Sequence, residues 1–240
     1  MRILGHRGAS SDAPENTLTA FRLAMDQGAD GVELDARLCG SGEVVVFHDE
    51  RLERLTGASG RVVDTSWAKL SQLEVAGPAG RPRERIPLLA EVLEALPRTA
   101  FVNVELKSED WNGTRVAEAA GALLEGGGHQ AHVVVSSFDA RCLLRLALAH
   151  PRLRRGLLLD PDKPQLVQRH LLLPLVGRDA VHPEAGHLSE ADVRRWHAGG
   201  REVAVWTVDD PDVARRLRGW GVDTCITNRP GALRAGLEDR

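Results

Sequence analysis

The 240-residue sequence has no long hydrophobic run and few cysteines, and both absences exclude whole classes of protein. No apolar stretch approaches the ~20 residues that a membrane span requires, and the residues after Met1 turn polar too soon for a secretory signal. The three cysteines, Cys39, Cys142 and Cys225, are far apart and include no Cys-x-x-Cys pair, which argues against a disulfide framework or a structural zinc site. We therefore expect a protein of the reducing cytoplasm without an integral membrane segment.

An excess of positive charge is also missing. The chain carries 31 basic and 34 acidic side chains, for a net charge of −3, so no global positive field favours nucleic acid as a partner. Apolar residues make up 42% and charged residues 27% of the chain, values typical of a globular protein with a substantial core. The composition leaves the number of subunits open.

Short β-type runs alternate with helix-like stretches along the chain. The expected strands cover residues 2–8, 31–38, 101–107, 132–138, 155–159, 179–182, 203–208 and 223–227. The expected helices cover residues 16–27, 88–96, 115–125, 140–149, 163–176, 189–197, 211–220 and 231–237, with Asn16 as the N-cap of the first. A further β-type run at 43–48 opens an excursion over about 43–87, which is rich in glycine, proline and arginine and holds one short helix near 66–74.

Eight strands, each followed by a helix except where the excursion intervenes, predict a (β/α)₈ TIM barrel with a small insertion after the second strand. No linker divides the chain, so we expect a single domain over residues 1–240. The rival architecture is the doubly wound open sheet, which usually carries a glycine-rich phosphate turn after its first strand. The stretch from Gly5 to Gly8 does not match that fingerprint.

Polar side chains stand at the ends of the first three expected barrel strands. They are His6, Arg7, Glu33, Asp35, Glu105 and Lys107. Barrel enzymes place their active sites at the carboxyl ends of the strands. Side chains two positions apart on a strand lie on the same face. Glu33 and Asp35 are therefore expected on one face of their strand, and Glu105 and Lys107 on one face of theirs. All six are expected to converge on one mouth.

Three carboxylates at one mouth indicate a cation. Glu33, Asp35 and Glu105 would repel one another and be costly to bury unless a positive charge occupied the space between them. Oxygen ligands alone favour Mg²⁺ or Ca²⁺ over zinc, which would be expected to have histidine or thiolate ligands. The competing interpretation, exposed strand residues, fits poorly because Glu33 and Asp35 lie in a run otherwise suited to burial.

Two histidines and two cations complete the candidate site. His6 ends the first strand and His48 ends the run at 43–48, and two imidazoles near a metal suit general acid and base roles at neutral pH. Arg7 and Lys107 place positive charge beside the carboxylates, which points to an anionic substrate, with phosphate as the obvious candidate. Salt bridges to the neighbouring acids are the simpler role for both cations and do not exclude the functional one.

These residues form an ordered set that resembles the glycerophosphodiester phosphodiesterase family over nearly the whole chain. The matching strings are His6-Arg7-Gly8, Pro14-Glu15-Asn16-Thr17, Glu33-Leu34-Asp35, His48-Asp49, Ile86-Pro87, Glu105-Leu106-Lys107 and Trp206-Thr207. Each string alone is weak, but the order and spacing together are specific. The excursion after His48 is similar to the small insertion that this family carries in its barrel.

The resemblance implies metal-dependent cleavage of a glycerophosphodiester to glycerol 3-phosphate and an alcohol. It assigns Glu33, Asp35 and Glu105 as metal ligands, His6 as the general base, and His48 as the general acid that protonates the leaving alcohol. The nucleophile is either water or a neighbouring hydroxyl of the substrate, and both routes use His6 in the same sense.

Arg7 and Lys107 are assigned by the resemblance to hold phosphoryl oxygens. Glu15 is expected to orient Arg7 or a metal ligand, and Asn16 to cap its helix. Trp206 either walls the alcohol side of the pocket or packs in the core.

The sequence departs from the family pattern at two late positions. Asp209 stands where the family often has Asn, and Asn228 stands where Asp is usual, so the last two loops bear on substrate preference more than on catalysis. Two alternatives to the hydrolase remain: a phosphoester-binding barrel without turnover, and a barrel lyase whose metal steadies an enolate. The presence of both His6 and His48 argues against the first, because binding alone needs no proton donor.

Overall fold

The computed structural model describes residues 1–240 except 79, 109–113, 127–131, 165–167, 169–171 and 239–240. Its main sheet is a closed barrel of parallel strands in the order β1-β11-β10-β9-β8-β7-β6-β2, with β2 pairing back to β1. The barrel strands are β1 (Arg2–His6), β2 (Gly31–Leu38), β6 (Phe101–Leu106), β7 (Val133–Ser137), β8 (Arg154–Leu158), β9 (Ala180–His182), β10 (Glu202–Val205) and β11 (Thr224–Thr227). The predicted TIM barrel is therefore confirmed.

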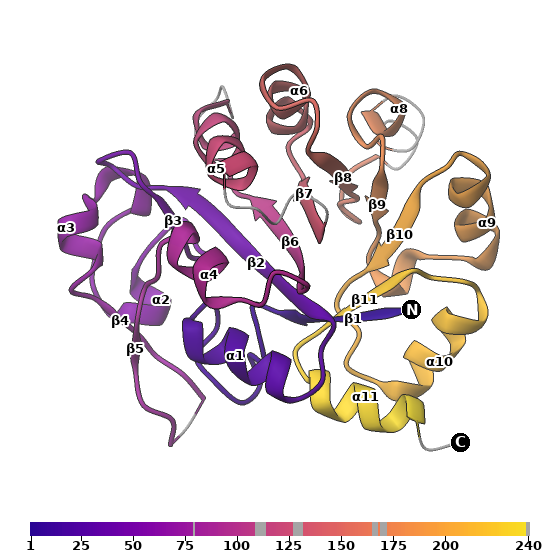
Figure 1. Ribbon diagram of the computed structural model, residues 1–240, viewed down its shortest axis with the longest axis horizontal. Coiled ribbons are helices and arrows are strands. Elements are labelled where there is room, and N and C mark those ends of the chain that lie inside the picture. Colours follow the sequence, from indigo (N-terminus) through magenta and orange to yellow (C-terminus); the bar gives the residue numbers. More distant parts are fainter. Residues whose placement is uncertain (79, 109–113, 127–131, 165–167, 169–171, 239–240) are drawn as a thin grey trace.

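Helices surround the barrel, with α5, α6 and α8 above it and α1, α11 and α10 below it in the view of Figure 1. They are α1 (Leu18–Asp26), α4 (Leu89–Ala95), α5 (Thr114–Gly126), α6 (Ala140–Ala149), α8 (Leu173–Val176), α9 (Glu190–Ala198), α10 (Pro211–Gly219) and α11 (Pro230–Glu238). Within the helix predicted over 163–176 the structure describes α-helix at α8, and residues 165–167 and 169–171 lie outside the described part of the chain.

The insertion leaves the barrel after β2. Its first strand, β3 (Val44–Val46), pairs antiparallel with residues Ala36 to Leu38 of β2, beyond the point where β1 ends. The chain then forms α2 (Glu53–Thr56), the 3₁₀ turn η1 (Val62–Asp64), α3 (Trp67–Leu70) and the small hairpin of β4 (Glu74–Val75) and β5 (Glu84–Arg85). This lobe, at the left of Figure 1, buries its own apolar cluster, and it contains more regular structure than the single short helix predicted from sequence.

Apolar side chains fill the barrel below its mouth. Leu4, Phe101, Val134, Ala180 and Ile226 come from five different strands and form one buried cluster. Two larger clusters lie between the strands and the surrounding helices. Because the strands are buried on both faces, a polar side chain that points inward near their carboxyl ends has only the mouth of the barrel to occupy.

The N-cap of α1 differs from the prediction. Thr17, not Asn16, has the extended backbone of a cap, and its hydroxyl accepts from the Ala20 backbone N–H. Asn16 instead has a left-handed backbone, with φ of 59°, and its side chain is turned into the barrel mouth. Asparagine tolerates the left-handed conformation better than most residues do. In this conformation the Asn16 side chain contacts Asp35 and does not cap the helix.

Candidate active site

The turn after β1 places Arg7 over the mouth of the barrel. Arg7 and Gly8 both have left-handed backbones, with φ of 55° and 83°, and a Cβ on Gly8 would lie 2.5 Å from the carbonyl carbon of Ala20. Only glycine allows the turn to pack this closely against α1. The turn directs the backbone N–H of Arg7 to Glu33 Oε2, 3.0 Å away.

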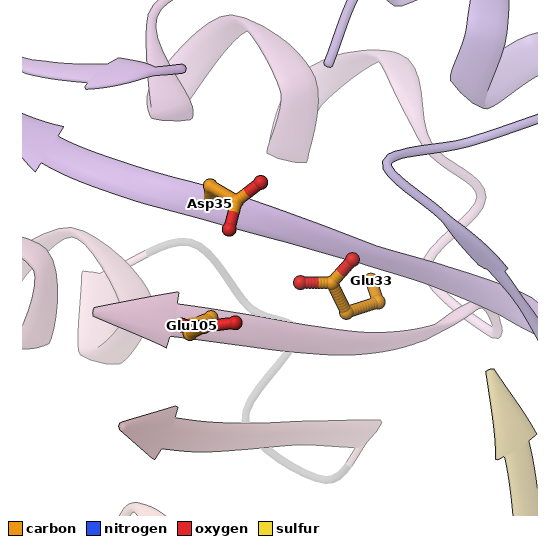
Figure 2. A group of neighbouring side chains, drawn as sticks. All are labelled: Glu33, Asp35 and Glu105. Carbon is orange, nitrogen blue, oxygen red and sulfur yellow. The ribbon is translucent and has the colours of Figure 1, made fainter. Parts of the chain in front are cut away.

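Three carboxylates meet at the centre of the mouth. Glu33 and Asp35 come from β2, and Glu105 comes from β6, where it lies in register with Asp35. All three are buried, and each offers one carboxylate oxygen within 4.8 Å of the other two. Figure 2 shows the three side chains close together, Glu33 and Asp35 on β2 and Glu105 on the neighbouring β6. The spatial convergence expected from the i and i+2 spacing is present in the structure.

Two cations lie against this cluster. Lys107 Nζ is 3.1 Å from Asp35 Oδ1 and also donates to Glu105. Arg7 lies between two acids, with Nε 3.2 Å from Asp35 Oδ2 and its terminal nitrogen 2.8 Å from Glu15 Oε1. The charge of the site is therefore mixed, as the sequence indicated, and Glu15 contacts Arg7 directly.

The three carboxyl groups have different pKa values because the balance between burial and nearby positive charge differs from one group to the next. Burial raises the pKa of the Glu33 carboxyl, and the negative charge of Asp35 raises it further. Burial also raises the pKa of Glu105, against the opposing charge of Lys107. Burial tends to raise the pKa of Asp35 as well, but the charges of Lys107 and Arg7 outweigh it and bring that pKa below its ordinary range.

Asn16 is part of this charge arrangement, which the sequence did not reveal. Its Nδ2 donates to Asp35 Oδ2 over 2.7 Å, and its Oδ1 accepts from the Asp35 backbone N–H over 3.2 Å. Both ends of the amide are therefore used to fix one carboxylate and its strand. The only available signal was the position of Asn16 beside Glu15, and its helix-capping propensity pointed to a different role.

The two histidines have different neighbours. His6 Nδ1 is 2.7 Å from the amide oxygen of Asn228, and its Nε2 is 3.9 Å from Glu33 Oε2. His48 Nδ1 is 2.7 Å from the carboxylate of Asp49. Burial lowers the pKa of both imidazoles below the ordinary value, and the charge of Arg7 lowers each further, while Asp35 raises it.

The insertion contributes Arg54, which contacts the residue that is hydrogen-bonded to His48. Arg54, on α2, donates to Asp49 Oδ1 over 2.8 Å and to Glu15 Oε1 over 2.9 Å, so it links the loop of His48 to the loop of Arg7. This link joins residues 15, 49 and 54, and Arg54 was not predicted from the sequence as part of the site. Nothing in the local pattern of the excursion marks Arg54 among its many arginines.

These side chains surround a cavity of about 210 Å³. Its lining residues are His6, Arg7, Glu33, His48, Asn103, Glu105, Lys107, Phe138, Leu158, Trp206, Thr207 and Ile226. Trp206 is a wall of this cavity and packs edge-to-face on Phe138, with ring centroids 5.6 Å apart. Trp206 also packs against the apolar cluster below the mouth, so it takes both of the positions that the sequence left open, and Phe138 lines the cavity beside it.

A larger hollow of about 480 Å³ lies outside the barrel, between α4 and α5. Its lining includes one acidic and one basic side chain, Glu94 and Arg98, among mostly small and apolar residues. The smaller cavity holds the convergent titratable groups and is the candidate active site. Within the described part of the chain no helix is long and apolar enough to span a bilayer.

Known proteins are similar to this chain in both sequence and fold. The model of the glycerophosphoryl diester phosphodiesterase family matches residues 6–232. A glycerophosphodiester phosphodiesterase of Caldanaerobacter subterraneus is 32% identical over 234 residues, which cover 96% of this chain and 95% of that protein.

Two solved structures superpose closely. A glycerophosphodiester phosphodiesterase of Thermotoga maritima is 32% identical, with a TM-score of 0.78 and coverage of 99% of this chain and 98% of that one. A phosphodiesterase of Oleispira antarctica, solved with the product sn-glycerol 3-phosphate, is 28% identical, with a TM-score of 0.87 and coverage of 100% and 97%.

Proposed function

Because this chain belongs to the glycerophosphoryl diester phosphodiesterase family, we propose that it cleaves glycerophosphodiesters to glycerol 3-phosphate and an alcohol in a metal-dependent, two-histidine reaction. The chain is a phosphodiesterase of the hydrolase class, as its relatives are named. The metal-dependent, two-histidine mechanism is supported by one observation: three carboxylates, two histidines and two cations lie together at one cavity. The product bound to the Oleispira antarctica relative supports glycerol 3-phosphate as the product here.

The carboxylate cluster fits a hard divalent cation. Glu33, Asp35 and Glu105 present only oxygen, and Glu33 Oε1 is buried with no hydrogen-bond partner among the described residues. Burial and mutual repulsion raise the pKa of Glu33 and Glu105, so a cation is needed before all three acids ionise together. Mg²⁺ or Ca²⁺ held there would supply Lewis-acid stabilisation of the charge on the phosphoryl group.

Arg7 and Lys107 bind the phosphoryl oxygens of the substrate and neutralise the negative charge that the divalent cation leaves uncompensated. In the structure both are paired with Asp35, and both line the cavity. A phosphodiester carries one negative charge that increases on its equatorial oxygens during attack at phosphorus, and fixed guanidinium and ammonium groups lower the cost of that charge. Phe138 and Trp206 also line the cavity and give the alcohol an apolar surface.

The neighbours of the two histidines support their proposed roles. His6 has a neutral amide behind its Nδ1 and a lowered pKa, so it is neutral at physiological pH and suits the general base. Burial lowers the pKa of His48 overall, and the Asp49 carboxylate behind its Nδ1 opposes that lowering and so favours the imidazolium that donates a proton to the leaving alcohol. The proton taken at His6 Nε2 and the proton given by His48 balance over one turnover.

The central test is hydrolysis of glycerophosphocholine and glycerophosphoethanolamine, with glycerol 3-phosphate as the measured product. We expect EDTA to abolish the reaction and added Mg²⁺ or Ca²⁺ to restore it. His6→Ala and His48→Ala should each lower kcat by about 10²- to 10⁴-fold. His132→Ala, at an exposed position, is the matched control and should retain full activity.

Several results would contradict the proposal. Activity that survives both EDTA and His6→Ala would remove the mechanism. Calorimetric binding of glycerophosphocholine without product would favour a phosphoester-binding barrel, and cleavage of a carbon–carbon bond would identify a lyase.

The metal site has its own test. Calorimetric titration with Mg²⁺ and with Ca²⁺ should show one binding event that Glu105→Gln removes. Glu94→Gln, in the hollow between α4 and α5, removes the same charge elsewhere and should bind the ion as wild type does. Equal binding to both variants would place the ion outside the carboxylate cluster.

We also propose a cytoplasmic location. Cys39, Cys142 and Cys225 are all buried and form no disulfide with one another, which suits a reducing compartment. Fractionation of cells of the source organism with an antibody against the protein tests this, and recovery from an exported fraction would contradict it.

A further inference from the structure

Two residues behind His6 form a bonded pair that the proposed mechanism does not use. Asp209 follows β10 and Asn228 follows β11. Asn228 Nδ2 donates to Asp209 Oδ2 over 2.7 Å, and the Asn228 backbone N–H donates to Asp209 Oδ1 over 2.8 Å. The hydroxyl of Thr227 donates to the same Oδ1 over 2.8 Å.

These bonds fix which way the Asn228 amide points. A carboxylate accepts and does not donate, so the side of the amide that faces Asp209 must be its NH₂ group. The carbonyl oxygen then faces the other way, where the Ser10 hydroxyl donates to it over 3.0 Å. The orientation is therefore set by the Asp209 carboxylate, with which the Ser10 hydroxyl is compatible as a donor, and it does not depend on how nitrogen and oxygen were assigned.

The oriented amide in turn decides the tautomer of His6. Its oxygen lies 2.7 Å from His6 Nδ1 and can only accept, so Nδ1 carries the proton and Nε2 keeps its lone pair. Nε2 is the ring nitrogen nearer the carboxylate cluster, 3.9 Å from Glu33 Oε2. A neutral histidine that acts as a base at the cavity needs its free lone pair at this nitrogen.

We propose that Asp209 is a positioning residue that acts through Asn228 to hold His6 as its Nδ1–H tautomer, with Nε2 free for proton transfer. This rests on the proposed function only for its catalytic consequence. The Asp209 carboxylate therefore acts on the His6 imidazole only through Asn228. The group that accepts from His6 Nδ1–H is the neutral amide oxygen of Asn228 and not a carboxylate. Asp209 touches neither the cavity nor the carboxylate cluster among the described residues, so it acts only by orientation.

Asp209→Asn provides a sharp test because it is isosteric. The Oδ1 of the new amide still accepts from Thr227 and the backbone, but its NH₂ now faces the NH₂ of Asn228. Two donors cannot pair, so the Asn228 amide turns over and presents N–H to His6 Nδ1. His6 is then forced into the Nε2–H tautomer, which cannot act as the base. We expect kcat to fall by about 10²- to 10⁴-fold while KM changes little.

The reciprocal variant should rescue the loss. In D209N/N228D the carboxylate at position 228 accepts from His6 Nδ1–H on one side and from the new amide at 209 on the other. The Nδ1–H tautomer returns and most of the lost kcat returns with it. Asp210→Asn is the matched control, since it removes a neighbouring charge from an N-cap that asparagine serves equally well.

The readout that does not depend on activity is ¹⁵N NMR of histidine-labelled protein in mildly alkaline buffer, with His6 assigned by its loss in His6→Ala. The protonated and unprotonated ring nitrogens have distinct shifts. We expect Nδ1–H in wild type, Asp210→Asn and the double variant, and Nε2–H in Asp209→Asn. If Asp209→Asn does not fold, Asn228→Ala takes its place and should give a mixture of tautomers.

An Nδ1–H tautomer that persists in Asp209→Asn, or in Asn228→Ala, would overturn the proposal. So would a double variant no more active than Asp209→Asn, if wild type is active. A wild type that hydrolyses no glycerophosphodiester would defeat the proposed function, while the ring shifts would still decide the role of Asp209.

Discussion

His182 is a buried histidine that should make the stability of the barrel depend on pH. It ends β9, it is 2% exposed, and neither ring nitrogen has a hydrogen-bond partner among the described residues. Its imidazole lies so close to β8 that a Cβ on Gly156 would be 2.5 Å from Nε2. Burial alone lowers the pKa of His182 from 6.5 to about 3, so the folded protein holds this ring neutral.

The magnitude follows from proton linkage. Below pH 6.5 the unfolded chain binds a proton at His182, whereas the folded protein does not bind it until about pH 3. The unfolded state therefore binds more protons in that window, and the free energy of unfolding falls as the pH falls. Between about pH 7.5 and about pH 5 this one group should remove about 2 kcal/mol, because each pH unit below 6.5 costs about 1.36 kcal/mol while only the unfolded chain binds the proton.

The assay is urea unfolding of wild type and His182→Gln at both pH values. Glutamine is uncharged at either pH, so the variant should lose about 2 kcal/mol less than wild type on acidification, whatever its absolute stability. His132→Gln changes an exposed histidine and should lose as much as wild type. Equal losses in wild type and His182→Gln, or a His182 ring that titrates near 6.5 by NMR in the folded protein, would refute the reasoning.

Three further outcomes follow from packing and hydrogen bonding. Asn16→Ala leaves the buried Asp35 carboxylate without its 2.7 Å donor and should cost about 1.5–3 kcal/mol in urea unfolding; an unchanged midpoint would show that this bond contributes nothing. Gly31→Ala places a Cβ 1.8 Å from a carbonyl oxygen of β6 and should cost more than about 3 kcal/mol, whereas Gly126→Ala, in open space at the end of α5, should cost nothing. The three cysteines are buried and form no disulfide with one another, so a thiol reagent should modify them only at the rate of unfolding; rapid labelling in native buffer would contradict their burial.

The alternation of strands and helices was readable from sequence because it depends on short-range patterns. A strand buried on both faces is rich in apolar residues, and the runs at β2 and β6 are of this kind, interrupted by polar residues such as Glu33, Asp35 and Glu105. The pleat places side chains two apart on one face, so Glu33 could be paired with Asp35 before any coordinates were known. Parallel strands then bring their carboxyl ends to one mouth, which is why Glu105 was placed with them.

The hydrogen-bond partners of these groups could not be read in the same way. Asn16 was predicted to cap a helix by its local propensity, but the tertiary structure uses it to hold Asp35, and Thr17 takes the cap. Arg54 reaches Asp49 and Glu15 from a lobe whose path no periodic pattern describes. In each case the contact depends on where a loop returns in space.

The sequence by itself therefore determined the barrel, the acidic strand ends and the candidate chemistry, because periodicity and strand polarity act over a few residues. Only the tertiary structure decided how the charges are shared among them, that Trp206 walls the cavity, and that Asp209 reaches His6 through Asn228. Hydrogen-bond direction and burial are properties of groups brought together from distant parts of the chain. They exist only once the barrel has closed.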